Sequence, residues 1–180
     1  MVCYQDEVHF QLNTTVARKW APKGSKPKVK SAPGRKNASY SGYVLPSTGE
    51  LIDTKPSWFN YQTVVESLRQ FLLELNLEKD KKVALVIDNA PWHKKAKRLI
   101  ESEDPQYSDI RDKVAIITLP PYSPDLNPIE QVWRKTRREV THNRYFKSVE
   151  ELSSAVDDYF KGFRRANSEL SSLCSFKHKY

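Results

Sequence analysis

The hydrophobic pattern divides the chain into expected strands and expected helices. Apolar and polar residues partly alternate in 2–10, whereas 83–87 (VALVI) and 114–119 (VAIITL) are almost entirely apolar. Partial alternation suits a strand with one buried face, and a short β-branched run suits a strand that is covered on both faces. Segments 40–45 and 50–54 flank a Pro-Ser-Thr-Gly turn and therefore predict a hairpin.

Apolar residues recur at helical spacing in the segments between and after these strands. Helices are expected to begin at Asn60, which suits an N-cap, and to span about 93–100, 128–140 and 149–165. The strands lead and the helices alternate with them later in the chain. The pattern therefore predicts a mixed α/β fold.

The run LPPYSPDLNPIEQVW, residues 119–133, passes directly from turn-forming prolines into an expected helix. Asn127 suits the N-cap, Pro128 suits the first helical position, and Glu130 can bond back to the cap. A carboxylate in the first turn of a helix, beside the end of a strand, also suits a metal ligand. These residues alone leave both roles of Glu130 open.

The charge pattern adds an anionic partner to this picture. The net charge is +8 and the pI is about 9.4, which favours nucleic acid. Residues 11 to about 38 contain no acidic residue and several prolines and glycines, so a basic loop is expected there. Contact with nucleic acid and simple solvation are both open for this loop. Trp20 within it is expected to pack on the body of the protein rather than to stack on a base.

The length and the remaining composition narrow the class of protein. With 180 residues, of which 38% are hydrophobic, the chain is expected to form one folded domain spanning 1–180. No apolar stretch is long enough to cross a bilayer, and the N-terminus has no signal-peptide pattern, so no membrane partner is expected. Cys3 and Cys174 have neither a disulfide framework nor zinc-ligand spacing. A reducing, cytoplasmic setting is therefore expected.

Acidic residues follow the two apolar strands. Asp88 comes directly after 83–87, and Glu130 lies just beyond 114–119. If these strands are parallel, both acids open onto the edge of the sheet where α/β proteins bind ligands. Asp6 is the natural third member, and neighbouring Glu7 then points to the opposite face. A turn or a helix cap remains the alternative for each of these acids taken alone.

Three converging carboxylates repel one another unless a cation lies between them. Hard oxygen ligands suit Mg²⁺ or Mn²⁺, and few carboxylates suffice when substrate phosphate and water complete the shell. The spacing of the three acids therefore predicts a site for such ions.

Four segments together resemble the catalytic domain of DDE transposases, in the branch of mariner-like elements and prokaryotic insertion sequences. They are YQDEVHF (4–10), RKWAPKG (18–24), VIDNAPWH (86–93) and the run 119–133. The resemblance implies an RNase H-like fold with a central mixed five-stranded sheet flanked by helices. It covers nearly the whole chain, and its last motif is long.

The resemblance assigns Asp6, Asp88 and Glu130 as the catalytic, metal-binding triad, holding two Mg²⁺ or Mn²⁺ ions. It implies cleavage of DNA at transposon ends by water, followed by strand transfer into target DNA. It also implies a homodimer on DNA and a nucleoid-associated location in a prokaryotic host. Such proteins normally carry helix-turn-helix modules before the catalytic domain. These are expected to be absent here, because only five residues precede Asp6.

Several further residues receive expected roles. His93 is expected to contact DNA phosphate or to orient a metal ligand. Asp125 is the rival of Glu130 but is expected to bond its own turn, and Trp92 and Trp133 are expected to pack. The expected DNA contacts are Arg18, Lys19, Lys23, Lys26, Lys28, Lys30, Arg35, Lys36, His93, Arg134, Arg137 and Arg138.

Two other functions compete with a transposase. One is a catalytically inactive DNA-binding relic of such an element, against which the intact acids argue. The other is a nuclease of RNase H type acting on RNA–DNA hybrids, for which SPDLNPIE (123–130) is the wrong signature. Metal-dependent DNA cleavage would distinguish a transposase from the inactive relic. The preferred substrate, DNA or RNA–DNA hybrid, would distinguish it from the RNase H-type nuclease.

Overall fold

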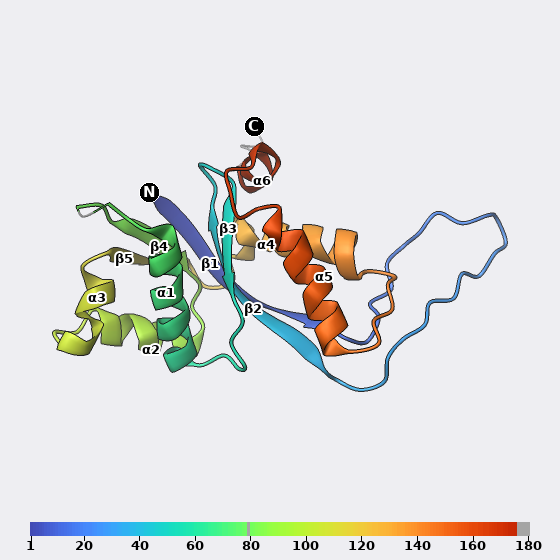
Figure 1. The fold of residues 1–180 in the computed structure, drawn as a ribbon, viewed down its shortest axis with the longest axis horizontal. Coiled ribbons are helices and arrows are strands. Elements are labelled where there is room, and N and C mark those ends of the chain that lie inside the picture. The colour runs from blue at the N-terminus through green and yellow to red at the C-terminus, as the bar shows by residue number, and fades with distance from the viewer. Residues whose placement is uncertain (79, 176–180) are drawn as a thin grey trace.

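The computed structural model describes residues 1–78 and 80–175 and is built on one five-stranded sheet (Figure 1). The strand order is β3-β2-β1-β4-β5, with β1 antiparallel to β2 and parallel to β4, and with β4 parallel to β5. The expected mixed five-stranded sheet is therefore confirmed. The strands are β1 (Val2–Gln11), β2 (Asn37–Leu45), β3 (Glu50–Thr54), β4 (Val83–Ile87) and β5 (Val114–Thr118).

Helices cover both faces of this sheet, and each face has its own hydrophobic core. One face carries α1 (Tyr61–Leu75), α2 (Pro91–Ile100), the 3₁₀ turn η1 (Pro105–Tyr107) and α3 (Ser108–Arg111). The other carries α4 (Ile129–Thr136), its π-helical continuation η3 (Arg137–Thr141), α5 (Val149–Lys161) and α6 (Ser168–Cys174). The 3₁₀ turn η2 (Pro124–Leu126) precedes α4.

The alternation along β1 separates the two cores. Cys3 belongs to the core under α1, whereas Val8 and Phe10 belong to the core under α4 and α5. Side chains of successive residues point to opposite faces of a strand. Asp6, two residues before Val8, therefore lies on the α4 face, and Glu7 lies on the α1 face.

Trp133 of α4 packs closely on the middle of the sheet because Gly42 of β2 has no side chain. A Cβ atom at Gly42 would lie 2.4 Å from Cη2 of Trp133. The indole is 1% exposed and meets the ring of Phe10 edge-on at 6.4 Å. Gly42 is also the β2 partner of Asp6, so this packing sets α4 directly beside the first acid.

Two of the expected elements differ in detail, and one segment without an expected element is helical. The helix expected over about 149–165 ends at Lys161. The charged segment 101–113, for which the hydrophobic pattern predicts no definite element, forms η1 and α3. Strand β5 lies at the edge of the sheet and, contrary to the prediction from its apolar run, is not covered on both faces, because Ile117 is 50% exposed. A short apolar run shows strand propensity but does not reveal how many neighbours the strand has.

The basic loop between β1 and β2, residues 12–36, extends away from the body of the protein (Figure 1). All eight of its Lys and Arg side chains are exposed. Trp20 is 99% exposed, so the expectation that it packs on the body is wrong. Only the base of the loop is fixed: Thr14 Oγ1 donates to the Arg144 carbonyl at 3.1 Å, and Ala17 N donates to Asn143 Oδ1 at 3.1 Å.

Within residues 1–78 and 80–175, no helix combines the length and the apolar character that a membrane crossing requires.

Candidate metal centre

The parallel pairing of β1 with β4 sets the first two acids level with each other. Tyr4 pairs with Val86, an offset of 86 − 4 = 82 residues. The same offset applied two residues further along aligns Asp6 with Asp88, which directly follows β4. Both residues lie an even number of positions from that pair, so both belong to the α4 face of the sheet.

Glu130 reaches the same place on the first turn of α4. The segment before this helix is tied to β1, because the side-chain amide of Asn127 donates to the Gln5 carbonyl at 3.2 Å. The expected N-cap role of Asn127 is therefore wrong: α4 begins at Ile129 without a side-chain cap, and the Asn127 amide serves β1 instead. Among the described residues, the Glu130 carboxylate accepts no hydrogen bond and remains available to a ligand.

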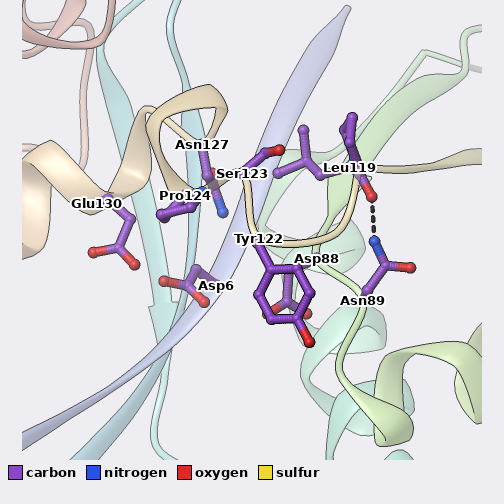
Figure 2. A pocket seen from close by; sticks show the side chains of 10 residues that line it. Asp6, Asp88, Asn89, Leu119, Tyr122, Ser123, Pro124, Asn127 and Glu130 are labelled. Atoms are coloured by element: carbon purple, nitrogen blue, oxygen red, sulfur yellow. Dashed lines mark hydrogen bonds between the residues drawn. The ribbon is translucent and has the colours of Figure 1, made fainter.

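The three acids line a single pocket of about 270 Å³ (Figure 2). In this view Asp6 lies between Glu130 and Asp88. Asp125, the rival of Glu130, does not line this pocket and lies beside another one, next to α6. The lining residues are Asp6, Asp88, Asn89, Leu119, Pro120, Tyr122, Ser123, Pro124, Asn127 and Glu130.

The Asp6 carboxylate is the most strongly perturbed of the three. Burial, followed by the negative charges of Glu130 and Glu7, raises its pKa to about 7. A hydrogen bond from Trp133 Nε1 to Asp6 Oδ2, at 3.0 Å, acts in the opposite direction. The surroundings of Asp6 therefore favour the binding of a positive charge.

The donor set fits a hard divalent ion. All candidate ligands are oxygens, and the buried Asn127 Oδ1 on the pocket wall has no hydrogen-bond partner among the described residues. The carboxylates do not form a closed cage, since no group of three or more His, Cys, Asp or Glu side chains in the described residues is close enough to hold an ion alone. The geometry therefore suits ions that also take water and substrate phosphate as ligands.

Asp88 lies in a different environment from Asp6. Its Oδ1 accepts hydrogen bonds from His93 Nδ1 at 2.5 Å and from the Ala90 backbone N–H at 2.8 Å. The bond from His93 is the main reason that the pKa of Asp88 is lowered. Asn89 Nδ2 donates to the Leu119 carbonyl and ties the end of β4 to the end of β5.

His93 is fully buried, with 0% of its surface exposed. Its other ring nitrogen, Nε2, bonds to Glu7 Oε1 at 2.8 Å. The expected contact with DNA phosphate is therefore wrong, because both ring nitrogens are used inside the protein. The other expected role, orientation of a metal ligand, fits this geometry.

Two neighbours of the acids were not foreseen from the sequence. Glu7 accepts hydrogen bonds from both His93 and Trp92, and Trp133 donates to Asp6 in addition to its expected packing. The alternation of β1 does place Glu7 on the face that α2 covers. A carboxylate buried there requires hydrogen-bond donors. The position of Glu7 in β1 is therefore the feature of the sequence that could have predicted donors from α2.

The expected DNA contacts on α4 and η3 differ in exposure. Arg134 is exposed, and Arg138 is exposed but pairs with Glu139 at 3.0 Å. Arg137 is half-buried, with its guanidinium 5.9 Å from the centre of the Phe10 ring. None of the three lines the acidic pocket.

The pKa of Asp6 predicts how the metal-free protein responds to pH. Its folded-state value of about 7 lies above the ordinary value of 3.8, so the unfolded chain releases this proton first. The contribution of Asp6 to the free energy of unfolding should therefore fall as the pH rises from about 4 to about 7, and remain lost above that. Asp6→Asn should remove this fall.

Urea unfolding of the wild type and of Asp6→Asn in EDTA, between about pH 4 and about pH 8, measures this difference. A difference in unfolding free energy that does not change with pH would contradict the raised pKa of Asp6.

Known proteins resemble this chain in sequence. A family model described as "DDE superfamily endonuclease" matches residues 1–153. The "Insertion element IS630 uncharacterized 39 kDa protein" of Shigella sonnei is 24% identical over 161 residues, which cover 89% of this chain and 44% of that protein. The "Uncharacterized protein y4pE/y4sA" of Sinorhizobium fredii is 30% identical over 89 residues, which cover 48% of this chain and 58% of that protein. The chain spans about half the length of these relatives.

Solved structures resemble it in fold. The Mos1 Strand Transfer Complex matches with a TM-score of 0.68 and 19% identity, over 96% of this chain and 50% of that one. The Mos1 mariner paired end complex with Mn gives 0.68 and 18%, over 96% and 51%. The Mos1 paired end complex with Mg gives 0.59 and 17%, over 96% and 53%. These matches confirm the RNase H-like fold.

Proposed function

Since this chain belongs to the DDE superfamily endonuclease family, we propose that it is the catalytic part of a transposase. It cleaves DNA at transposon ends with divalent metal ions and transfers the freed strand into target DNA. The observation that carries this proposal is the single pocket lined by Asp6, Asp88 and Glu130. Three chain segments far apart in sequence bring one acid each to that pocket.

The three acids and the residues that hydrogen-bond to them have different proposed roles. Asp6, Asp88 and Glu130 would hold two Mg²⁺ or Mn²⁺ ions, which supply the positive charge that stabilises the attacking and leaving oxygens of a phosphoryl displacement. The Trp133 indole fixes Asp6 Oδ2, and the bonds from His93 and Ala90 fix Asp88 Oδ1. The protein thus contributes position and charge, which are the main needs of phosphoryl transfer.

The attacking group changes between the two steps. Water attacks the phosphate at the transposon end and releases a 3′-hydroxyl, which then attacks a phosphate of the target DNA. Each step breaks one phosphate–oxygen bond and forms another, so no covalent bond between protein and DNA is needed. The printed descriptions of the Mos1 structures, a strand transfer complex and paired end complexes with Mn and Mg, support the same metals and two paired ends here. We therefore also propose that two copies act together on DNA.

An inactive relic is not favoured. All three acids remain in the pocket, and two of them are held by specific hydrogen bonds from Trp133 and His93. A chain without catalytic use for these acids gains nothing from burying Asp6 at a raised pKa.

Nicking of supercoiled DNA tests the proposal. With Mn²⁺, the full chain should convert a supercoiled plasmid to the nicked form, and a polymerase should extend the new ends directly because they carry 3′-hydroxyls. EDTA should abolish the cleavage, and an RNA–DNA hybrid should not be preferred as substrate. No nicking in Mn²⁺ at any DNA sequence offered, or a clear preference for the hybrid, would contradict the proposed function.

A further inference from the structure

Glu7 is a buried carboxylate on the face of β1 opposite to Asp6. Its side chain is 7% exposed, and three donors converge on it. Oε1 accepts from His93 Nε2 at 2.8 Å and from Gln5 Nε2 at 2.8 Å, and Oε2 accepts from Trp92 Nε1 at 3.2 Å. Burying a carboxylate is costly unless such donors surround it. The arrangement is therefore a specific one, formed by residues of β1 and α2.

His93 lies between two carboxylates. Nε2 faces Glu7 at 2.8 Å, and Nδ1 faces Asp88 at 2.5 Å. Ionised carboxylates only accept hydrogen bonds, so each ring nitrogen has to donate an N–H to satisfy both partners. Because both of its nitrogens are held, the ring can neither flip nor rotate without breaking a bond to a charged partner.

Asp88 is held on one side only. Its Oδ1 accepts the bonds from His93 and from the Ala90 backbone, whereas Oδ2 accepts none from the described residues. The Asp88 side chain is 48% exposed and lines the acidic pocket. One oxygen is thus fixed by the protein, and the other is left for a ligand in the pocket.

We propose that Glu7 and His93 are positioning residues that hold Asp88 in its metal-binding orientation. Glu7 fixes the ring of His93, and the ring fixes Oδ1 of Asp88, so that Oδ2 is presented to the ions. Neither Glu7 nor His93 touches DNA or metal, and Glu7 acts from the opposite face of the sheet. The inference rests on the proposed function, because it gives Asp88 the role of a metal ligand.

Hydrogen bonds to a metal ligand, such as those to Asp88 here, affect metal affinity in many proteins. Groups that bond to a metal ligand set its direction, and their removal typically weakens metal binding by about 10–100-fold. Here the chain has two links rather than one. Loss of Glu7 should therefore act on the metal although Glu7 lies two hydrogen bonds away from Asp88.

The test measures Mn²⁺ affinity rather than cleavage. The electron paramagnetic resonance signal of free Mn²⁺ is titrated against the full chain in the presence of a DNA duplex. Glu7→Gln keeps the shape of the side chain but turns one acceptor into a donor, and it should weaken Mn²⁺ binding by about 10–100-fold. His93→Gln tests the same links from the other end, so either variant can decide if the other fails to fold.

A matched control separates positioning from general stability. Tyr43 is 1% exposed on the same face of the sheet, and its hydroxyl bonds to Ser67 Oγ at 2.9 Å rather than to Glu7, His93 or Asp88. Tyr43→Phe removes a buried hydrogen bond but should leave Mn²⁺ affinity within about twofold of the wild type. The melting temperature of each variant in EDTA reports the cost to the fold separately.

The double variant Glu7→Gln/His93→Gln adds a second criterion. If the two residues act through one another, the double variant should bind Mn²⁺ no more weakly than the weaker single variant. Wild-type affinity in folded Glu7→Gln or in folded His93→Gln overturns the positioning role alone. Equal losses in Glu7→Gln and Tyr43→Phe also overturn it. Absence of Mn²⁺ binding by the wild type overturns the proposed function and the positioning role together.

Discussion

Asp6→Asn and Glu130→Gln should each lower the rate of Mn²⁺-dependent DNA cleavage by more than about 10³-fold, because ions held by these acids would supply several kcal/mol of transition-state stabilisation. Each substitution keeps the size of the side chain and removes a negative charge from the acidic pocket. The loss should lie in the cleavage step and not in the fold. Single-turnover cleavage of a nicking substrate, followed on denaturing gels, measures the rate.

The electrostatics of the pocket add a second expectation for Asp6→Asn. Burial and the charge of Glu130 disfavour the ionised form of Asp6, since they raise its pKa to about 7. The variant should therefore be at least as stable as the wild type in EDTA at about pH 8, although it is far less active. A gain in stability with a loss of activity is typical of a functional site and not of a structural one.

Asp125→Asn is the matched control for these variants. Asp125 lies in η2, only five positions before Glu130, but it lines a different pocket. Its substitution should leave the cleavage rate within a few-fold of the wild type. If Asp125→Asn abolished cleavage while Glu130→Gln did not, the third acid of the triad would be Asp125.

Replacing four lysines of the basic loop by Gln should weaken DNA binding by about 10³-fold at 0.15 M salt. Each phosphate contact contributes about 0.9 to the slope of log affinity against log salt, so four contacts contribute about 3.6. If the wild type and the variant bind equally at 1 M salt, this difference in slope makes the variant bind about 10³-fold more weakly at 0.15 M salt. The four residues are Lys23, Lys26, Lys28 and Lys30, all of them exposed.

The loop geometry supports this magnitude. The loop extends from the body of the protein on a base held by Thr14 and Ala17, so its exposed cations are accessible to DNA phosphates (Figure 1). Fluorescence anisotropy with a labelled duplex at several salt concentrations measures the slope. The control exchanges four exposed lysines elsewhere: Lys81, Lys82, Lys113 and Lys161. A similar change of slope in both variants would show that the loop is only one basic surface among others.

Much of the site can be predicted from the sequence because it depends on local order along the chain. Strands followed directly by an acid place Asp88 at a sheet edge, and alternation alone separates Asp6 from Glu7. The parallel register then brings Asp6 and Asp88 level, as the pairing of Tyr4 with Val86 shows. These inferences need only the periodicity of strands and the position of motifs.

The parts that the sequence did not predict depend on contacts between distant segments. Glu7 and His93 are 86 positions apart in the sequence, and no local pattern predicts the hydrogen bond between them. Asn127 has the residue type of an N-cap, but its amide is used by the Gln5 carbonyl instead. Trp20 has the residue type of an anchor, but it lies on a loop that extends beyond the body. In each case tertiary contacts outweigh the local preference.

The most direct test of the central claim is whether the acidic pocket binds a divalent ion. The measurement is thermal unfolding of the wild type and of Asp88→Asn, with and without Mn²⁺, in the presence of a DNA duplex. At 100-fold excess over the dissociation constant, binding should add about 2.7 kcal/mol to the free energy of unfolding. For a domain of this size, the melting temperature should rise by roughly 5–10 °C in the wild type and much less in Asp88→Asn. An equal rise in both proteins, or no rise in either, would contradict the assignment of this pocket as a metal centre.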